Sequence, residues 1–437
     1  MKTAKTRGRG KPGLKREIGF WEATIYGVGI ILGAGVYALI GEAAGMAGNS
    51  VWMSFAMAAL VGLLTGLSYM ELISMFPKAA AEYVYVKNAF KSRLLAFDVG
   101  WIAIFASVIA TAAVALGFAG YLHELVGAPV VLSAIALISV MSVVNFWGIR
   151  ETTRLNTVFS LVEVAGLVFV VLLALFFGHY GSVDYFEMPN GVSGVMSGAA
   201  LIFFAYIGFE DIANISEEAK NPRKVLPKAL IAAVAITTVL YVLVGMAVVS
   251  LVGWEDLAAS KAPLALAVSS VLGGNAFWLM SVIALFATAN TVLLGLVVGS
   301  RMMYGMARDG SLPGVLSRVH KKRFTPWVSL SVSMALAVAF VFIGQIKVVA
   351  SVTDMCMLCI FMFVNASVIL LRYSMPNAKR EFRTPLNIGK FPVLPLMGMV
   401  AAAALLLHLS PESLMIGAAV AVSGVVAYKM QTHKKLM

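Results

Sequence analysis

The chain has 437 residues, of which 60% are hydrophobic and only 12% are charged, and its mean hydropathy is +0.91. A soluble fold of this length cannot hide so much apolar surface, so the composition excludes a water-soluble protein and predicts an integral membrane protein. The net charge of +12 would suit nucleic acid, but the basic residues flank the apolar segments instead of forming one patch.

Twelve apolar segments are long enough to cross a bilayer as helices, at about 20 residues each. They cover residues 21–44, 50–76, 94–121, 128–147, 155–178, 194–216, 227–252, 275–304, 326–344, 348–372, 391–408 and 411–430. The sequence therefore predicts an all-α integral membrane protein with twelve transmembrane helices. The basic start of the chain runs directly into a first segment that is too long for a signal peptide, so none is expected.

Basic residues lie on one side of this predicted topology. With the N-terminus inside, every Lys and Arg except Lys261 and Lys347 falls in a terminal tail or in a cytoplasmic loop. This positive-inside pattern predicts that both termini are cytoplasmic, and we expect a multi-pass protein of the plasma membrane. The basic N-terminal tail is interpreted as a topology signal and a contact for anionic lipid, and no nucleic-acid partner is expected.

The first apolar segment is interrupted by glycine. Its stretch GVGIILGAGVYALIG carries the small triplet Gly33-Ala34-Gly35 in the middle. Backbone groups that leave a helix inside a bilayer are costly unless a polar partner meets them. The break therefore predicts a polar ligand at mid-membrane.

The sixth segment has a second break, in FFAYIGFEDI around Gly208. Five segments separate the two breaks, so segments 1–5 and 6–10 are predicted to be two copies of one unit. An odd number of helices places the second copy upside down, which gives a 5+5 inverted repeat with its substrate site where the repeats meet. Helices 11 and 12 fall outside the repeat and are candidates for packing or homodimer contacts.

The predicted organisation has four parts. They are a basic cytoplasmic tail (1–19), a ten-helix transporter core (20–373), a cytoplasmic loop with helices 11 and 12 (374–430) and a cytoplasmic C-terminal tail (431–437).

Five stretches, in the right order, resemble the amino acid–polyamine–organocation permeases. They are GVGIILGAGVY, SYMELISMFPKAAAEYVYVKNAF, FFAYIGFEDIANISEEAKNPRKVLPKAL, MYGMARDGSLPGVLSRVHKKRFTPW and LRYSMPNAKREFRTPL. The resemblance runs from about residue 17 to about residue 395. It implies a LeuT-like fold of ten helices in two inverted halves, with helices 1 and 6 broken, plus two more helices, and the movement of amino acids or related amines.

The resemblance also implies how the substrate head is bound. Backbone N–H groups near Gly33, Ala34 and Gly35 are expected to receive the carboxylate, because the half-helix that begins there offers unpaired donors and the positive end of its dipole. Relatives often carry Ser at the position of Ala34, so a hydroxyl contact is absent here. The amine is expected to meet carbonyls near Ile31.

In the sixth segment, the carbonyls of Phe204 and Ile207 are expected to complete the amine site, and Phe204 stands where relatives carry an aromatic gate. The substrate side chain is expected to point toward helices three, eight and ten, past Ile104 and Ser107. Helices three and eight bring no acidic residue to that depth, which favours neutral, small-to-medium amino acids. Glu210 or Asp211, after the second break, would shift this preference.

Glu163 lies midway along the apolar fifth segment. Buried ionisable residues in a membrane are expensive and usually functional, and an isolated carboxylate there is expected to be protonated. Several relatives carry a lysine at the aligned position, so their lysine mechanism does not transfer. Glu163 is a candidate proton carrier, a cation ligand together with Thr288 or Thr291, or a structural residue paired with a neighbouring helix.

Two further carboxylates have candidate roles. Glu210 is predicted either to sense protons or to accept backbone N–H bonds at the second break. The adjacent Asp211 is assigned no role. Glu71, near the inner end of the second segment, is expected to form an intracellular gate pair with a basic residue, with a solvated helix end as the alternative.

No enzyme constellation is visible in the sequence. The five histidines lack metal-ligand spacing, and Cys356 and Cys359 are interpreted as small membrane residues, so no metal and no cofactor are expected. A channel filter and a signalling domain are also missing from the pattern. The sequence therefore predicts a secondary active amino acid transporter that works by alternating access. H⁺ is the leading coupling ion, ahead of Na⁺, and the alternatives are an exchanger without net ion coupling and a polyamine or cationic amino acid permease.

Overall fold

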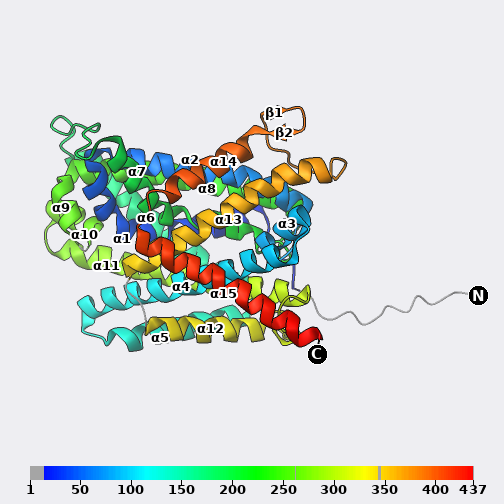
Figure 1. The fold of residues 1–437 in the computed structure, drawn as a ribbon. Helices are drawn as coiled ribbons and strands as arrows, with labels where there is room; N and C mark the ends of the chain where they lie inside the picture. The colour runs from blue at the N-terminus through cyan, green and yellow to red at the C-terminus, as the bar shows by residue number, and fades with distance from the viewer. Residues whose placement is uncertain (1–13, 261, 343–345, 437) are drawn as a thin grey trace, which may run out of the picture.

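A computed structural model of the protein describes residues 14–260, 262–342 and 346–436 (Figure 1). Most of the predicted basic tail, residues 1–13, lies outside the described residues, as do Lys261 and Met437. The α-helices are α1 (Phe20–Ala47), α2 (Val51–Met75), α3 (Ala81–Phe90), α4 (Arg93–Val126), α5 (Val130–Trp147), α6 (Ile149–Phe177), α7 (Gly191–Ile202), α8 (Pro222–Leu251), α9 (Trp254–Ala259), α10 (Pro263–Leu272), α11 (Asn275–Arg308), α12 (Trp327–Val341), α13 (Ile346–Ser374), α14 (Val393–Leu406) and α15 (Pro411–Leu436). The short elements are the 3₁₀ helices η1 (Gly48–Ser50), η2 (Phe203–Tyr206), η3 (Phe209–Ala213) and η4 (Gly314–Ser317), and the strands β1 (Asn387–Ile388) and β2 (Phe391–Pro392).

The protein is a multi-pass helical membrane protein. Within the described residues, 10 segments are long and apolar enough to cross a membrane. Each of the twelve expected segments contains a helix, but α12 has 15 residues and α14 has 14. Helices of that length extend about 22 Å, which is less than a hydrocarbon core of about 30 Å.

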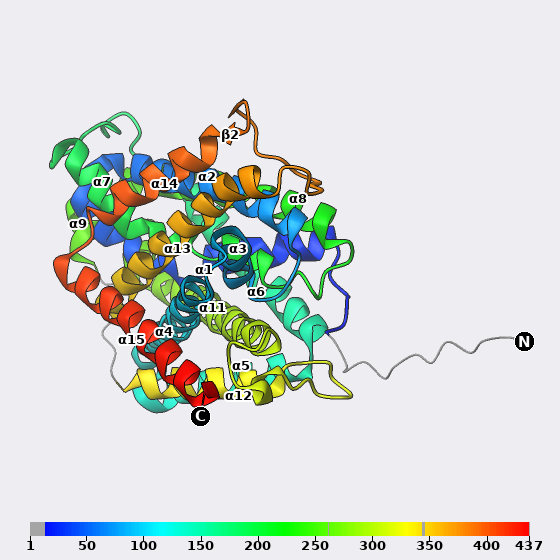
Figure 2. The ribbon, with the colours of Figure 1, turned by 45° about the vertical axis from the view of Figure 1, so that its right-hand side comes forward.

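The long helices pack around α1. α11 lies along α4, and α2 lies along α8, while α1 contacts both α8 and α11. Figure 2 shows α5 and α12 on one side of the molecule and α2, α7 and α14 on the opposite side, with α1 and α13 between them. The broken first segment is therefore central, between the two groups of helices.

Several elements lie outside the predicted spans. α9 and α10 occupy the connection between α8 and α11, and they lie at the opposite end of the molecule from α3 and the β1–β2 hairpin (Figure 1). In the hairpin, Asn387 pairs with Pro392 and Ile388 with Phe391. The predicted C-terminal tail is helical through Leu436, because α15 continues past the end of the expected span.

Candidate functional site

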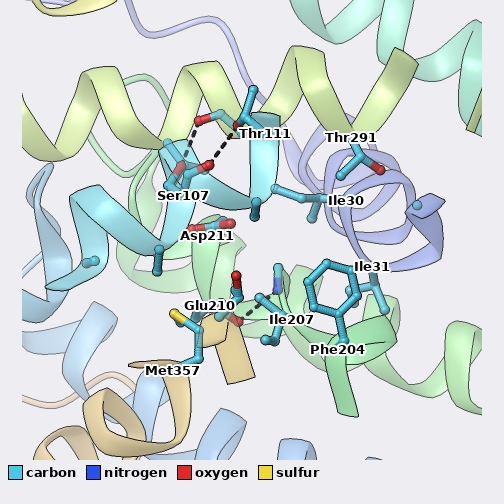
Figure 3. A pocket seen from close by; sticks show the side chains of 18 of the residues that line it. Ile30, Ile31, Ser107, Thr111, Phe204, Ile207, Glu210, Asp211, Thr291 and Met357 are labelled. Atoms are coloured by element: carbon cyan, nitrogen blue, oxygen red, sulfur yellow. Dashed lines mark hydrogen bonds between the residues drawn. The ribbon is translucent and has the colours of Figure 1, made fainter. Parts of the chain in front are cut away.

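The two predicted helix breaks line one cavity. Its walls come from α1, α4, the η2–η3 segment, α11 and α13, and its empty volume, including the open mouth, is about 770 Å³. Gly33, Ala34 and Gly35 lie on one side and Phe204 and Ile207 on another, and Figure 3 shows Phe204 beside Ile31.

The α1 break is centred on Gly33, which has φ 0° and ψ −161° inside an otherwise continuous helix. The N–H of Ala34 donates to Oγ1 of Thr291 at 3.2 Å, so α11 holds one of the three donors predicted for the carboxylate. A Cβ atom on Gly35 would lie 2.6 Å from Cα of Ala205. Only glycine therefore allows α1 to approach η2 this closely.

The second break is a pair of 3₁₀ turns joined by an extended Ile207 and by Gly208 at φ +123°. Glu210 contributes to this turn, because its Oε2 accepts the N–H of Gly208 at 3.0 Å. Its Oε1 atom has no hydrogen-bond partner among the described residues, although the side chain is 1% exposed. This leaves one carboxylate oxygen of Glu210 available at the cavity.

Tyr241 of α8 ties the two breaks together, and sequence reasoning missed it. Its hydroxyl donates to the carbonyl of Ile31 at 2.6 Å and to the carbonyl of Ala205 at 3.1 Å. The Ile31 carbonyl, expected to face the substrate amine, thus already has a protein donor. No pattern in the apolar α8 sequence marks this tyrosine, since its partners come from two other elements.

The wall from α4 is built from small side chains. Ala103, Ala106 and Ser107 line the cavity, and Ser107 Oγ donates to the carbonyl of Gly295 at 2.8 Å. Ile104 is buried but is not in the cavity lining. The helical period explains the difference, because positions 103, 106 and 107 share a face from which 104 is turned by about 100°.

An acidic wall faces the cavity from α3 and η3. Glu82, Glu210 and Asp211 line it, and the described lining contains no Lys or Arg. The Glu82 carboxylate accepts from the Tyr69 hydroxyl at 3.0 Å and from Nδ2 of Asn214 at 3.4 Å. Sequence reasoning named Glu210 and Asp211 but not Glu82, whose position depends on how α3 folds back beneath the cavity.

Glu163 lies outside the cavity lining and is fully buried. The Asn290 side chain approaches its carboxylate, which has no other side-chain hydrogen-bond partner among the described residues, and Tyr37 donates to its main-chain carbonyl at 3.3 Å. One turn earlier, Ser160 lies 3.3 Å from Nδ2 of Asn290, which donates to the carbonyl of Gly29 at 3.2 Å. Glu163 thus stands beside a polar crossing of α1, α6 and α11.

Glu71 is not a solvated helix end, because its side chain is 1% exposed. Arg372 donates to both of its oxygens at 2.7 Å, and Arg380 donates to Oε1 at 2.9 Å. The backbone N–H of Thr384 adds a bond at 2.9 Å. This network joins α2 to the end of α13 and to the loop before β1, while the gate role predicted for Glu71 stays a prediction.

A multi-pass helical protein whose broken helices open backbone groups onto one central cavity is a transporter rather than an enzyme. The profile of a family described as "Amino acid permease" matches residues 18–427, and the chain belongs to this family. The chain is similar to the branched-chain amino acid permease BcaP of Bacillus subtilis, with 32% identity over 92% of this chain and 89% of that protein.

Two other relatives carry different substrate names. The methylthioribose transporter of Bacillus subtilis is 30% identical over 88% of this chain and 86% of that protein. The chloroplastic cationic amino acid transporter 9 of Arabidopsis thaliana is 32% identical over 70% of this chain and 58% of that protein. Family membership therefore does not determine which substrate side chain this permease accepts.

Proposed function

We propose that this permease carries small-to-medium neutral amino acids by alternating access and that protons drive the transport. The convergence of the two breaks on one cavity carries the proposal. N–H groups at the start of a half-helix suit a carboxylate, which would compete with Thr291 for the Ala34 N–H, and carbonyls of the second break suit an ammonium group. The small side chains of α4 leave room for an uncharged substrate side chain.

Glu163 supports proton coupling. A fully buried carboxylate that pairs with no cation among the described residues is compatible with the bilayer when it is neutral, so it must release its proton to a more polar environment in another conformation. Its place beside the α1 break would let substrate binding and proton release influence each other. Sodium coupling is the competing interpretation, since the carbonyl of Gly29 and the side chain of Asn290 lie nearby.

The test is uptake of a panel of labelled amino acids into proteoliposomes under a pH gradient, a sodium gradient, or with internal amino acid only. We expect a pH gradient to drive accumulation of a neutral amino acid. Glu163→Gln should abolish this accumulation while preserving counterflow exchange, because the substrate site is intact but the titrating group is gone. Glu255→Gln makes the same chemical change at an exposed position and serves as the control.

Other outcomes have distinct meanings. Uptake driven by a sodium gradient alone would mean that Na⁺, and not H⁺, is the coupling ion. Uptake only into preloaded vesicles would mean that the protein is an exchanger. Wild-type-like accumulation by Glu163→Gln would remove Glu163 from the coupling.

The acidic wall favours a second candidate, transport of cationic amino acids or polyamines. Glu82, Glu210 and Asp211 would attract a side-chain ammonium or guanidinium group, and the described cavity lining offers no basic side chain to oppose them. Arginine, ornithine and putrescine therefore belong in the same panel. Competition by these amines, and its loss in Asp211→Asn, would favour this candidate over the neutral one.

The membrane arrangement proposed with this function has twelve spans, a 5+5 inverted repeat and both termini in the cytoplasm, in the plasma membrane. The one-sided distribution of Lys and Arg supports the orientation. α14 and α15 lie outside the proposed repeat, and α15 is exposed along much of its length. They are the proposed contact for a homodimer, through parts of these helices other than the face of Val422, Val426 and Met430.

A further inference from the structure

A groove lined by basic residues lies away from the transport cavity, at one end of the helix bundle. Two adjoining pockets share Lys87 and Arg93; Lys91 and Ser374 complete one, and Asp309, Tyr428 and Gln431 are in the other. We call this the basic groove. α3 and the C-terminal end of α15 lie at the same end of the molecule (Figure 1).

The groove carries more positive than negative charge. Its lining has three basic side chains and one acidic side chain. Lys87 pairs with Asp309, whereas Lys91 and Arg93 are exposed and have no ion-pair partner within the described residues. Lys91 ends α3 in a left-handed conformation with φ +53°, and α4 begins two residues later, so this turn fixes the two unpaired cations close together.

The groove lies where membrane spans end. The apolar spans of α4, α13 and α15 begin or end at Arg93, Ser374 and Gln431, respectively. Since residues of all three span ends line the groove, it lies at the depth of the lipid headgroups. The other end of each span leads into the hydrocarbon region.

An apolar surface continues from the groove along α15. Val422, Val426 and Met430 recur at helical spacing and are 62%, 50% and 63% exposed. In a membrane such a face contacts acyl chains. A molecule with a negative headgroup and apolar tails would therefore satisfy both the unpaired cations and the α15 face, which a free anion would not.

We propose that the basic groove is a binding site for the phosphate headgroup of an anionic phospholipid, with its acyl chains along α15. Basic pockets at the inner face of helical membrane proteins have the charge and depth for such headgroups. The site is separate from the amino acid cavity and does not depend on which substrate the permease carries. The site also includes Lys87, which pairs with Asp309, so a bound phosphate and Asp309 would both interact with Lys87.

The test uses the full-length protein purified in dodecyl maltoside. Its melting temperature is measured against phosphatidylglycerol, phosphatidylcholine and inorganic phosphate, because a ligand that binds the folded state raises it. We expect phosphatidylglycerol alone to raise it in a saturable manner. Lys91→Gln combined with Arg93→Gln should weaken the apparent affinity about 30-fold, from the loss of two basic groups near an anionic lipid.

The matched control is Lys321→Gln combined with Lys322→Gln, which removes the same charge from another exposed basic loop. It should retain the wild-type affinity. Equal weakening in both double variants would overturn the proposal, since only net charge would then matter. An equal response to inorganic phosphate, or native mass spectra of the wild type without retained phosphatidylglycerol, would overturn it as well. Amino acid uptake by both variants in phosphatidylcholine vesicles checks that they are folded.

Discussion

Gly35 shows how one absent side chain shapes the site. Its α1 backbone lies against Ala205 of η2, and an added Cβ would stand 2.6 Å from the Ala205 Cα. Gly35→Ala is expected to force α1 and η2 apart and to abolish substrate binding in an equilibrium binding assay. The overpacking should also lower the free energy of unfolding by about 1–3 kcal/mol.

Gly120→Ala is the matched control for this substitution. Gly120 lies in α4, and a Cβ there would meet nothing within 4 Å. Alanine should be tolerated or slightly stabilising at this position, because it favours helix more than glycine does. Retention of wild-type affinity by Gly35→Ala would mean that the close approach of α1 and η2 is not required.

At the same scale, the sequence predicted the breaks but not what holds them. Gly33 and Gly208 were recognisable because each interrupts an apolar segment at mid-length and the two segments lie five spans apart. Thr291 and Tyr241 were not recognisable as partners of the breaks, because a threonine and a tyrosine are ordinary in such helices. Their significance comes only from packing, which brings hydroxyl groups from α11 and α8 to free backbone groups of α1.

Between elements, the strongest polar link is the Glu71 network. Removing its carboxylate charge by Glu71→Gln leaves Arg372 and Arg380 buried without a counter-charge, and breaking such a pair typically costs about 3–5 kcal/mol. We expect the melting temperature in detergent to fall by several degrees. Glu381→Gln, which removes an acid that pairs with the exposed Lys379, should leave the melting temperature nearly unchanged. Equal melting of both variants would show that the network does not stabilise the fold.

A second link, between α3 and the loop after α11, depends on pH. Burial alone would raise the pKa of Asp309, but hydrogen bonds from Lys87 and Tyr83 and the charge of Lys87 outweigh it and hold the pKa below its usual value of 3.8. A lowered pKa means that the stabilisation is present above pH 3.8 and is lost as the pH falls through the lowered value. The melting-temperature difference between wild type and Asp309→Asn should therefore be constant from pH 7 to about 4 and shrink below it. A difference that grows on acidification would contradict this assignment.

The elements themselves were predicted unevenly. Long apolar segments identified every major helix, because hydrophobic length is a direct requirement of the bilayer. α9 and α10 were not predicted, since helices of 6 and 10 residues in a connection do not have that length. Glu82 was missed for a different reason. Its place in the cavity lining depends on how α3 packs in the folded protein, which residue spacing does not reveal.

For the whole molecule, the proposed alternating access requires that elements on either side of the cavity separate at one end. Arg301 of α11 and Glu218, which follows η3, form a pair in which both side chains are 1% exposed, with Nη2 and Oε1 2.8 Å apart. The N-terminal segment closes over the same place, since the backbone N–H groups of Glu17 and Ile18 donate to the Glu218 carbonyl. Opening this end of the molecule must break the pair and hydrate both charges.

Removal of the pair should shift the equilibrium between closed and open states. Glu218→Gln leaves Arg301 buried and unpaired only in the closed arrangement, and a destabilisation of about 3 kcal/mol would change the ratio of states by about 150-fold.

The shift can be measured with Ala103→Cys, which places a thiol on the cavity wall, after Cys356 and Cys359 are replaced by serine. A membrane-impermeant maleimide should then react faster from the predicted cytoplasmic side in Glu218→Gln. Glu17→Gln, which alters the pair of a half-buried carboxylate with the exposed Lys15, should leave the rate unchanged. Equal rates in all three proteins would exclude the pair as the closure, because a gate whose loss costs several kcal/mol in one state must alter access to the cavity behind it.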